Sequence, residues 1–482
     1  MPFRDAHPLD RLFYPRNVAM VGASPKRGRK WSSGNSYIVG SIKHSFPGHI
    51  YPVHPTAESI LGYKAYPSIR DLPEAVDLVI FTIPTRAALK VMEDCVAKGV
   101  KFVHLLTAGF TETGRPEHAE MERELLDIAR RGGIRIVGPN CMGLYSPEGG
   151  LAWSDEFPDR VGPIGFFSQS GQLASHFVIQ GAHLGLTFSK VVSFGNAVDL
   201  QAHDFLEYFA GDDEIKVMGA YLEGLRDGRA FFEAARRITP HKPLVIWKGG
   251  QTEGGARASR SHTAAVAGSA RIWQAFCRQA GIIPVNSMDE ARFTMAALLN
   301  LKALPGGTKV AILGGAGGGS VTMTDLAERE GLEVPHLAAE TVAGIETFVP
   351  IEGHSARNPL DIDIERPEHF FKLMELLRDD PNVDVFLYNL HFRWIYRDRG
   401  RAGVNELIQQ AVKARELIGK PVFIVVEREG SMEMDAMAAE ATQWFQEAGL
   451  PTFDSFEIAA RVLYRLNQYR EFKDLSRRAG AH

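Results

Sequence analysis

The sequence predicts an α/β protein built from parallel sheets covered by helices, and two features of the chain indicate this fold class. First, three segments share one pattern, in which a short apolar strand runs into a turn rich in Gly or Ser and then into a helical stretch; their strands are expected at 17–21, 165–167 and 309–313. Second, each segment continues as an alternation of strands and helices, which is typical of parallel sheets. A chain of 482 residues accommodates about three domains of roughly 100–200 residues each.

The remaining elements follow from short apolar runs between helical stretches. In the first block, further strands are expected at 49–53, 78–82, 102–106 and 135–137. In the later blocks, strands are expected near 190–193, 217–221, 244–247, 385–387 and 422–426, and a last helix from 456 to 469.

Two stretches interrupt this pattern and mark domain boundaries. Residues 146–163 are rich in Gly, Pro and Asp, and Pro305, Gly306 and Gly307 break a helical pattern. Such residues favour turns over regular elements. The predicted domains are residues 1–146, 160–303 and 307–482.

Composition excludes several classes of function. The formal net charge is -4, and no half of the chain is strongly basic, so neither a nucleic-acid partner nor attraction to a membrane is expected. Three cysteines without CxxC spacing cannot build a disulfide framework, which favours a reducing cytoplasm. The first 15 residues contain no apolar core of a signal peptide, and no apolar run approaches the ~20 residues of a membrane span.

The first glycine turn, VGASPKRGRKW, has the position of a phosphate-binding turn but lacks the GxGxxG spacing of dinucleotide-binding proteins. The end of the second strand also lacks the acidic residue that binds an NAD ribose, so NAD is disfavoured. Lys26 and Arg27, followed by Arg29 and Lys30, instead suit a ligand with several phosphates, such as coenzyme A. A solvated basic loop on an ordinary α/β domain would give the same pattern.

The second turn contains Ser168, Gln169, Ser170 and Gly171 at the start of a helix. Hydroxyls and backbone N–H groups at a helix N-terminus form an anion site. Simple N-capping by Ser170 explains the same residues.

His262 lies in the segment SRSHTAAVAGS, between an Arg- and Ser-rich approach and a run of small residues. A histidine that carries a phosphoryl group needs a neutral, nucleophilic nitrogen and a thin, mobile loop, and Arg257 and Arg260 would screen the phosphate charge. Glu223 ends a strand, where it would bind one ring nitrogen of His262 and make the other nucleophilic. The alternative for Glu223 is a surface ion pair with Arg226, and a lone histidine is usually structural.

Cys141 follows Gly138-Pro139-Asn140 and is interpreted as a structural thiol, because nothing near it in sequence would lower its pKa. Four further histidines show no metal-ligand spacing and are interpreted as structural: His54, His104, His176 and His354. No metal site is therefore expected. The sequence also contains no HExxH, Walker or ATP-grasp pattern.

Taken together, these motifs resemble the NDP-forming acyl-CoA synthetases, which are relatives of succinyl-CoA synthetase. The resemblance runs from about Leu9 to Phe472 and includes several motifs in the family's order: VGAS, ILGYKAYPS, GPNC, FSQSG, SFGN, YLEG, SHTAAVAGS, GGAGGGS, NPLDI and FEIAARVLYRLNQYREF. It implies a Rossmann-like CoA-binding domain followed by two flavodoxin-like ligase domains with parallel sheets.

The resemblance also implies roles for individual residues. His262 matches the phosphorylated histidine, and Glu223 matches the carboxylate that steadies it. The turn from Ser168 to Gly171 matches the site of the phosphoryl group. The residues that match positions at coenzyme A and its thioester are Gly22, Ser24, Val53, Pro55, Pro84, Asn140 and Cys141. Family members often carry a Lys where this chain has Thr56, and the resemblance leaves Lys26 or Arg27 to replace that phosphate contact.

The implied reaction makes an acyl-CoA from a small carboxylate, coenzyme A and ATP or GTP, through an acyl phosphate and a phosphohistidine. The nucleotide with its Mg²⁺ would bind an ATP-grasp partner of β-subunit type in an α2β2-like assembly. Two alternatives stay open: a CoA-binding regulatory or scaffold protein, and a nucleotide-independent CoA enzyme such as a hydrolase or transferase.

Overall fold

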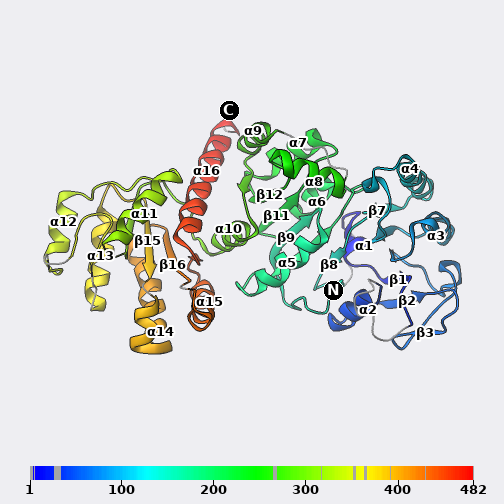
Figure 1. Cartoon of the computed structure of the whole chain (residues 1–482), viewed down its shortest axis with the longest axis horizontal. Coiled ribbons are helices and arrows are strands. Elements are labelled where there is room, and N and C mark those ends of the chain that lie inside the picture. Colours follow the sequence, from blue (N-terminus) through cyan, green and yellow to red (C-terminus); the bar gives the residue numbers. More distant parts are fainter. Residues whose placement is uncertain are drawn as a thin grey trace. The chain divides into compact units, whose positions relative to one another are not determined.

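The computed structural model describes residues 4, 6–25, 34–263, 269–315, 317–350, 354–362, 366–390, 392–428 and 430–480. Three sheets made mainly of parallel strands, each accompanied by helices, confirm the predicted α/β fold class (Figure 1). The chain divides into two compact units, one of Met1–Ala182 with Leu186–Asn286 and one of His183–Gly185 with Ser287–His482.

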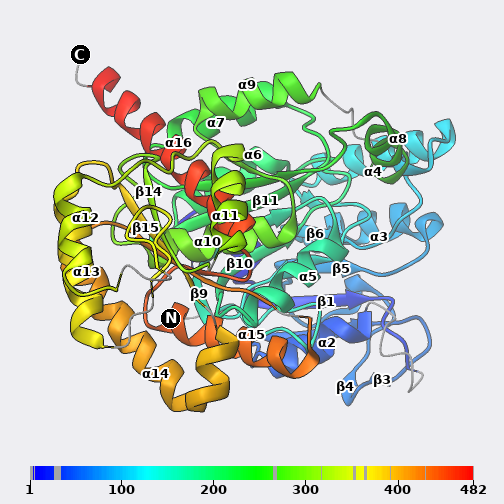
Figure 2. The same ribbon diagram turned by 60° about the vertical axis from the view of Figure 1, so that its left-hand side comes forward.

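The first sheet is entirely parallel, in the order β2-β1-β5-β6-β7. Its strands are β1 (Asn17–Val21), β2 (His49–Val53), β5 (Leu78–Phe81), β6 (Phe102–Leu105) and β7 (Arg135–Val137). The all-buried sequence of β5, LVIF, is typical of a strand covered on both faces. Helix α2 (Gly34–Lys43) lies on one face, and α3 (Thr85–Lys98) and α4 (Pro116–Arg131) pack together on the other (Figures 1 and 2).

Connecting segments complete this part of the first unit. Helix α1 (Asp10–Phe13) precedes the sheet, and a small hairpin of β3 (Ser59–Ile60) and β4 (Tyr63–Lys64) follows β2. Two short 3-10 helices, η1 (Ile69–Asp71) and η2 (Thr111–Thr113), follow in the chain.

The second sheet has the order β13-β12-β11-β9-β10-β8, and only β8 pairs antiparallel within it. Its strands are β8 (Gly143–Tyr145), β9 (Val161–Ser168), β10 (Phe188–Ser193), β11 (Val217–Leu222), β12 (Leu244–Lys248) and β13 (Ile283–Val285). Helix α5 (Gly171–Ala182) covers one face. The helices grouped on the other face are α6 (Ala202–Ala210), α7 (Gly228–Ile238) and α9 (Ala270–Ala280), and α8 (Glu253–Thr263) lies between β12 and α9 in the chain (Figure 2).

The second unit holds a four-stranded parallel sheet in chain order: β14 (Val310–Leu313), β15 (Val385–Leu390), β16 (Val422–Val426) and β17 (Thr452–Phe453). One group of mutually packed helices contains α12 (Ala339–Glu346), α13 (Pro367–Asp379), α14 (Phe392–Ile418) and α15 (Met432–Glu447). The other contains α10 (Met288–Asn300), α11 (Gly318–Arg329) and α16 (Phe456–Gly480).

The predicted strands all lie at observed strands, whereas other elements differ from expectation. The strands that were not predicted are β3, β4, β8, β13 and β17, and α16 runs to Gly480, well beyond the expected end at 469. Strand β8 comes from the end of the first predicted domain but joins the second sheet, and α10 belongs to the second unit. The predicted domain bounds 1–146, 160–303 and 307–482 stay a prediction.

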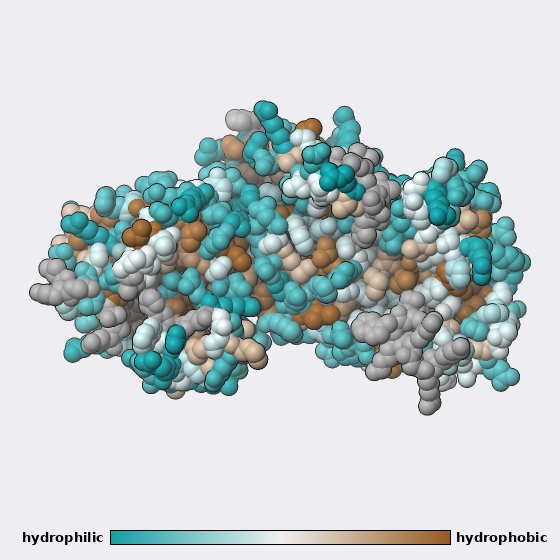
Figure 3. Space-filling view, viewed as in Figure 1, coloured by the Kyte–Doolittle hydropathy of each residue, from teal (hydrophilic) through white to brown (hydrophobic). Residues whose placement is uncertain are grey.

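Among the described residues, no helix has the length and apolar character that crossing a bilayer requires. The face drawn in Figure 3 accordingly shows hydrophilic side chains interspersed with apolar ones.

Candidate functional site

The turn after β1 carries the first of the predicted CoA-binding residues. Gly22 has a φ of +95°, and a Cβ there would lie 2.6 Å from the carbonyl oxygen of Thr82. Glycine is therefore required both by the backbone conformation and by the close approach of the neighbouring strand end. The Ser24 N–H donates to Asn35 Oδ1 over 2.8 Å, and the Asn35 amide donates to the Ser24 carbonyl over 3.0 Å, which ties the turn to α2.

Three more predicted CoA-binding residues follow the carboxyl ends of neighbouring strands. Val53 ends β2, Pro55 follows it, and Pro84 directly precedes α3. Val53 is buried, whereas Pro55 and Pro84 are exposed. This edge is where parallel α/β sheets usually bind ligands. Lys26 and Arg27 lie outside the described residues, so their contact with CoA phosphates stays a prediction.

Residues 138–142 connect the carboxyl edges of the first and second sheets. The Asn140 N–H donates to the Thr107 carbonyl over 3.0 Å, and the Met142 N–H donates to Ser193 Oγ over 3.1 Å. A Cβ on Gly171 would lie 2.0 Å from Cγ of Met142, so this turn packs directly on the start of α5. The predicted thioester region and the predicted phosphate turn are therefore neighbours.

Cys141 is buried within this turn, with 5% of its surface exposed. Its thiol donates to the Leu105 carbonyl over 3.4 Å, and burial raises the pKa of the Cys141 thiol well above its ordinary value. The thiol is consequently protonated at neutral pH, which suits a structural role better than a nucleophilic one.

Tyr37 and His104 hold the same turn from inside the first domain. The Tyr37 hydroxyl donates to the Met142 carbonyl and accepts the Leu144 N–H over 3.1 Å. Nδ1 of His104 lies 3.2 Å from the Tyr37 hydroxyl, and its Nε2 lies 3.3 Å from the Cys141 carbonyl oxygen. Burial lowers the pKa of His104 to about 4, so the ring is neutral at pH 7. His104 was interpreted as a structural histidine, but these partners were not predictable because they are distant in the chain.

The turn from Ser168 to Gly171 is built by its own hydroxyls. The Ser168 hydroxyl donates to the Ser170 carbonyl over 2.7 Å, and Ser170 Oγ accepts the Leu173 N–H over 3.4 Å. Ser170 thus acts as an N-cap. Within the part of the chain that the structure describes, no hydrogen bond joins the N–H of Gly171 or of Gln172 to an acceptor. Two donors at the helix start remain for an anion, alongside the cap.

Gln169 fixes the position of Glu223. The side-chain oxygen of Gln169 accepts hydrogen bonds from the backbone N–H of Glu223 over 2.5 Å and of Gly224 over 3.0 Å. The backbone N–H of Gln169 donates to the Tyr221 carbonyl over 3.1 Å. The Tyr221 hydroxyl donates to Glu223 Oε1 over 3.2 Å. The end of β11 is thereby bound to the end of β9, and Glu223, 5% exposed, is held beside the start of α5.

Lys248, at the end of β12, lies against the same strand end. Its ammonium donates to the Glu223 carbonyl over 2.7 Å and is 8% exposed. Burial lowers the pKa of Lys248, and the nearby charge of Glu223 opposes this shift. Sequence reasoning missed this lysine, although its place at the end of a strand was a usable signal.

Arg226 pairs with Glu122 rather than with Glu223, the surface partner considered for it in the sequence analysis. Its Nη2 lies 3.3 Å from Glu122 Oε1, and its Nε donates to the Asn196 carbonyl over 2.9 Å. The Asn196 amide in turn donates to Glu112 over 2.7 Å, and the Asn140 amide lies 3.4 Å from Asn196 Oδ1. This network, which the sequence did not reveal, ties the Asn140 turn to the loop after β10.

The backbone of His262 lies in the last turn of α8. Its side chain, like that of Arg260, lies outside what the structure describes, so the pairing of His262 with Glu223 and the screening by Arg257 and Arg260 stay predictions. Helix α8 contacts η2 of the first domain. Because α8 starts five residues after β12 and reaches this element, the His262 backbone and the carboxyl edge of the first sheet belong to one compact unit.

Comparison with known proteins assigns the chain to a family. A model described as a CoA binding domain matches residues 16–147, and one described as a succinyl-CoA ligase like flavodoxin domain matches residues 161–299. The alpha subunit of acetate–CoA ligase (ADP-forming) II from Pyrococcus furiosus is 34% identical over 467 residues, covering 95% of this chain and 97% of that relative. This chain belongs to the family of ADP-forming acetate–CoA ligase alpha subunits.

Further relatives agree with this assignment. The acetate–CoA ligase (ADP-forming) II of Archaeoglobus fulgidus is 34% identical over 96% of this chain and 67% of its own length. The chain is also similar to a solved acetyl-coenzyme A synthetase 1 of Ca. Korarchaeum cryptofilum, in complex with phosphate and ADP. The TM-score is 0.80 and the identity is 30%, and the match covers 98% of each chain.

Membership confirms the predicted relationship to NDP-forming acyl-CoA synthetases, the ligase class, and a Rossmann-like CoA-binding domain followed by flavodoxin-like ligase structure. The first matched region contains every described residue that was predicted to bind coenzyme A. The Pyrococcus relative is named as an alpha subunit, which implies a partner subunit for that protein.

Proposed function

We propose that this chain is the CoA-binding and phosphohistidine-bearing subunit of an acyl-CoA synthetase that makes acyl-CoA from a small carboxylate, coenzyme A and ATP or GTP. The observation that carries the proposal is the arrangement at the second sheet. Glu223 is held by the Gln169 amide next to the start of α5, where two backbone N–H groups have no described acceptor. A buried carboxylate beside an anion site is the environment that a phosphorylated histidine needs.

The turns at the carboxyl edge of the first sheet fit coenzyme A as the second substrate. Gly22 lets the first turn pack closely against Thr82, where any side chain would collide, and so shapes the turn at the edge where we place the ligand phosphates. Ser24, Val53, Pro55 and Pro84 lie at strand ends and turns of the same sheet, and we place coenzyme A along them. Asn140 lies in the adjoining turn, where we place the thioester end of the ligand.

The chemistry divides into three phosphoryl and acyl transfers. A ring nitrogen of His262 first attacks the terminal phosphorus of the nucleotide on an ATP-grasp partner that would supply Mg²⁺, the bond to that phosphorus breaks, and the nucleoside diphosphate leaves. A carboxylate oxygen of the substrate then attacks the phosphorus on His262, the N–P bond breaks, and an acyl phosphate forms. The CoA thiolate finally attacks the acyl carbon, and inorganic phosphate leaves. Dividing the reaction into these transfers replaces one difficult step by several easier ones.

The residues around His262 have defined roles in these transfers. Glu223 accepts a hydrogen bond from one ring N–H and stabilises the positive ring after phosphorylation. The N–H groups of Gly171 and Gln172 donate hydrogen bonds to phosphate oxygens, and their fixed orientation stabilises the charge on the transferring group. Because the same histidine must reach both the partner's nucleotide and the carboxylate, we propose that the His262 segment moves between them.

A reconstituted assay tests this function directly. The chain is combined with the ATP-grasp protein of its host, acetate is supplied as the first carboxylate because the relatives are named for it, and CoA-dependent ADP release is measured. His262→Ala is expected to abolish turnover while CoA binding stays within about twofold. His241→Ala, an exposed histidine after α7, is the matched control and keeps full activity.

Activity retained in His262→Ala would remove the phosphohistidine from the mechanism. Turnover without any nucleotide would favour a hydrolase or transferase instead. CoA binding without turnover on any carboxylate would favour the regulatory or scaffold alternative.

A further inference from the structure

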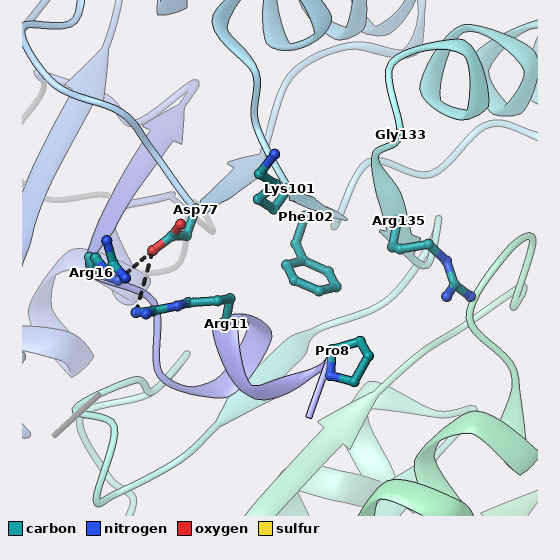
Figure 4. A pocket seen from close by; sticks show the side chains of 8 residues that line it. All are labelled: Pro8, Arg11, Arg16, Asp77, Lys101, Phe102, Gly133 and Arg135. Atoms are coloured by element: carbon teal, nitrogen blue, oxygen red, sulfur yellow. Dashed lines mark hydrogen bonds and ion pairs between the residues drawn. The ribbon is translucent and has the colours of Figure 1, made fainter. Parts of the chain in front are cut away.

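A basic pocket lies at the amino edge of the first sheet (Figure 4). Its volume is about 490 Å³, and it is lined by Pro8, Arg11, Arg16, Asp77, Lys101, Phe102, Gly133 and Arg135. Arg16, Asp77 and Lys101 directly precede β1, β5 and β6. The residues assigned to coenzyme A follow the opposite ends of these strands, roughly 13–17 Å away for strands of four or five residues. The pocket is therefore separate from the site described above.

Positive charge dominates the lining. Arg135 is largely neutralised, because its Nε lies 2.8 Å from Asp199 and its Nη2 lies 3.7 Å from Asp204. The other cations are Arg11, Arg16 and Lys101, which exceed the single carboxylate, Asp77, by two formal charges. Such an excess in a concave site attracts an anion of about two charges.

Both arginines approach Asp77. The backbone N–H of Arg16 donates to Asp77 Oδ2 over 2.9 Å, and Nη1 of the Arg11 guanidinium lies 4.0 Å from the same oxygen (Figure 4). Lys101 differs from both, because its ammonium makes no hydrogen bond or ion pair with any residue that the structure describes. The pocket thus combines the Arg11 guanidinium, held beside Asp77, with the Arg16 side chain and one ammonium group that is open to a ligand.

The Arg11 side of the pocket is fixed in place before any ligand binds. Its side chain is only 12% exposed, and Leu12 and Phe13 of the same helix are fully buried. Asp10 accepts a hydrogen bond from the Tyr208 hydroxyl over 2.8 Å, which ties α1 to α6. A guanidinium group that is already ordered loses little conformational entropy when a ligand binds.

We propose that this pocket binds the phosphate groups of a small diphosphate-bearing molecule, independently of coenzyme A. Guanidinium groups match phosphate oxygens through paired N–H donors, which a monocarboxylate uses less fully. Two excess positive charges favour a multiply charged phosphate ligand over a singly charged acid. The volume lies within the range of roughly 300–1,000 Å³ of small-ligand sites and exceeds what a phosphate group alone fills.

Calorimetric titration of the CoA-saturated full chain with inorganic pyrophosphate tests the proposal. Lys101→Gln, at an exposed position that does not endanger folding, is expected to weaken the binding about tenfold, and Arg11→Gln at least as much. Arg229→Gln removes one positive charge from an 88% exposed arginine on α7 and is the matched control, expected to leave the affinity unchanged.

ADP serves as a second probe. Tighter binding of ADP than of pyrophosphate assigns the pocket to a nucleotide, and equal binding assigns it to the diphosphate group alone; both support the proposal. Absence of pyrophosphate binding, binding that is unchanged in Lys101→Gln, or binding that occurs only when the chain is free of coenzyme A would each overturn it. Loss of activity in the reconstituted ligase would not affect these readouts, so the two proposals fail separately.

Discussion

Replacement of Gly22 by alanine tests whether the first turn must pack closely against Thr82 in order to hold the ligand. The substitution meets two penalties. Its φ of +95° strains a residue with a side chain, at about 1–2 kcal/mol, and the new Cβ would lie 2.6 Å from the Thr82 carbonyl oxygen, 2.8 Å from Thr82 Oγ1 and 2.9 Å from Ile83 Cγ2. Contacts this short displace the turn and add about 1–3 kcal/mol.

Gly99→Ala separates these two penalties. Gly99 ends α3 with a φ of +76°, and a Cβ there would meet nothing within 4 Å. It therefore carries the backbone strain without the collision, and it lies at the amino edge of the sheet, away from the proposed CoA site. The difference between the two variants isolates the cost of crowding at Thr82.

Urea unfolding and CoA titration of both variants give the two readouts. Gly22→Ala is expected to lose about 1–3 kcal/mol more unfolding free energy than Gly99→Ala and at least tenfold in CoA affinity, whereas Gly99→Ala keeps CoA affinity within about twofold. Equal stability losses would contradict the inferred close approach. Equal CoA affinities would show that this turn does not hold the ligand.

Three further substitutions probe the second sheet and the turn between the sheets. Gln169→Leu leaves the N–H groups of Glu223 and Gly224 without their acceptor, so the unfolding free energy in urea should fall by about 2–4 kcal/mol; a loss below about 0.5 kcal/mol would contradict the bonding described. Glu223→Gln should slow phosphorylation of His262 at least tenfold in rapid-quench experiments while CoA affinity is kept, and an equal loss of both would indicate a purely structural role. Burial lowers the pKa of His104 from 6.5 to about 4. Between these two pH values the unfolded chain therefore binds more protons than the folded chain. The stability that His104 contributes above about pH 6.5 is consequently lost as the pH falls toward 4. Between about pH 7 and pH 5 this contributes about 2 kcal/mol, which His104→Gln should remove from the pH dependence of urea unfolding; an unchanged pH dependence would exclude His104 as its source.

The sheets were predictable where a strand is apolar and its turn is marked by Gly or Ser. Strands β8 and β13 were missed for physical reasons. Each has three residues, β13 contains Pro284 and lies at the edge of its sheet, and β8 forms an antiparallel edge after a turn, so neither gives a periodic pattern. The length of α16 was underestimated, because its later turns are polar on most sides.

The site residues were predictable as positions, but their supports were not. Turn and strand-end residues such as Gly22, Ser170 and Glu223 carry a local signal in the sequence. The Gln169 side chain instead acts on Glu223, 54 residues away, and Tyr37 acts on Met142, 105 residues away. Such contacts depend on which strands are neighbours, which no local pattern contains.

The basic pocket was even less predictable from local sequence patterns. Arg11, Arg16 and Lys101 are ordinary surface residues in the sequence, and only the parallel order of β1, β5 and β6 brings them to one edge. Their combined charge becomes visible once the amino ends of these strands are placed together.

The most direct measurement of the central claim is the mass of the chain after phosphorylation. The purified protein is incubated with a lysate of its host and ATP, repurified, and analysed by intact mass spectrometry and peptide mapping under neutral conditions. The account predicts one acid-labile phosphate on His262, which is lost on addition of ADP or of a carboxylate with coenzyme A. A chain that binds coenzyme A but carries no phosphate on His262 under these conditions would contradict it.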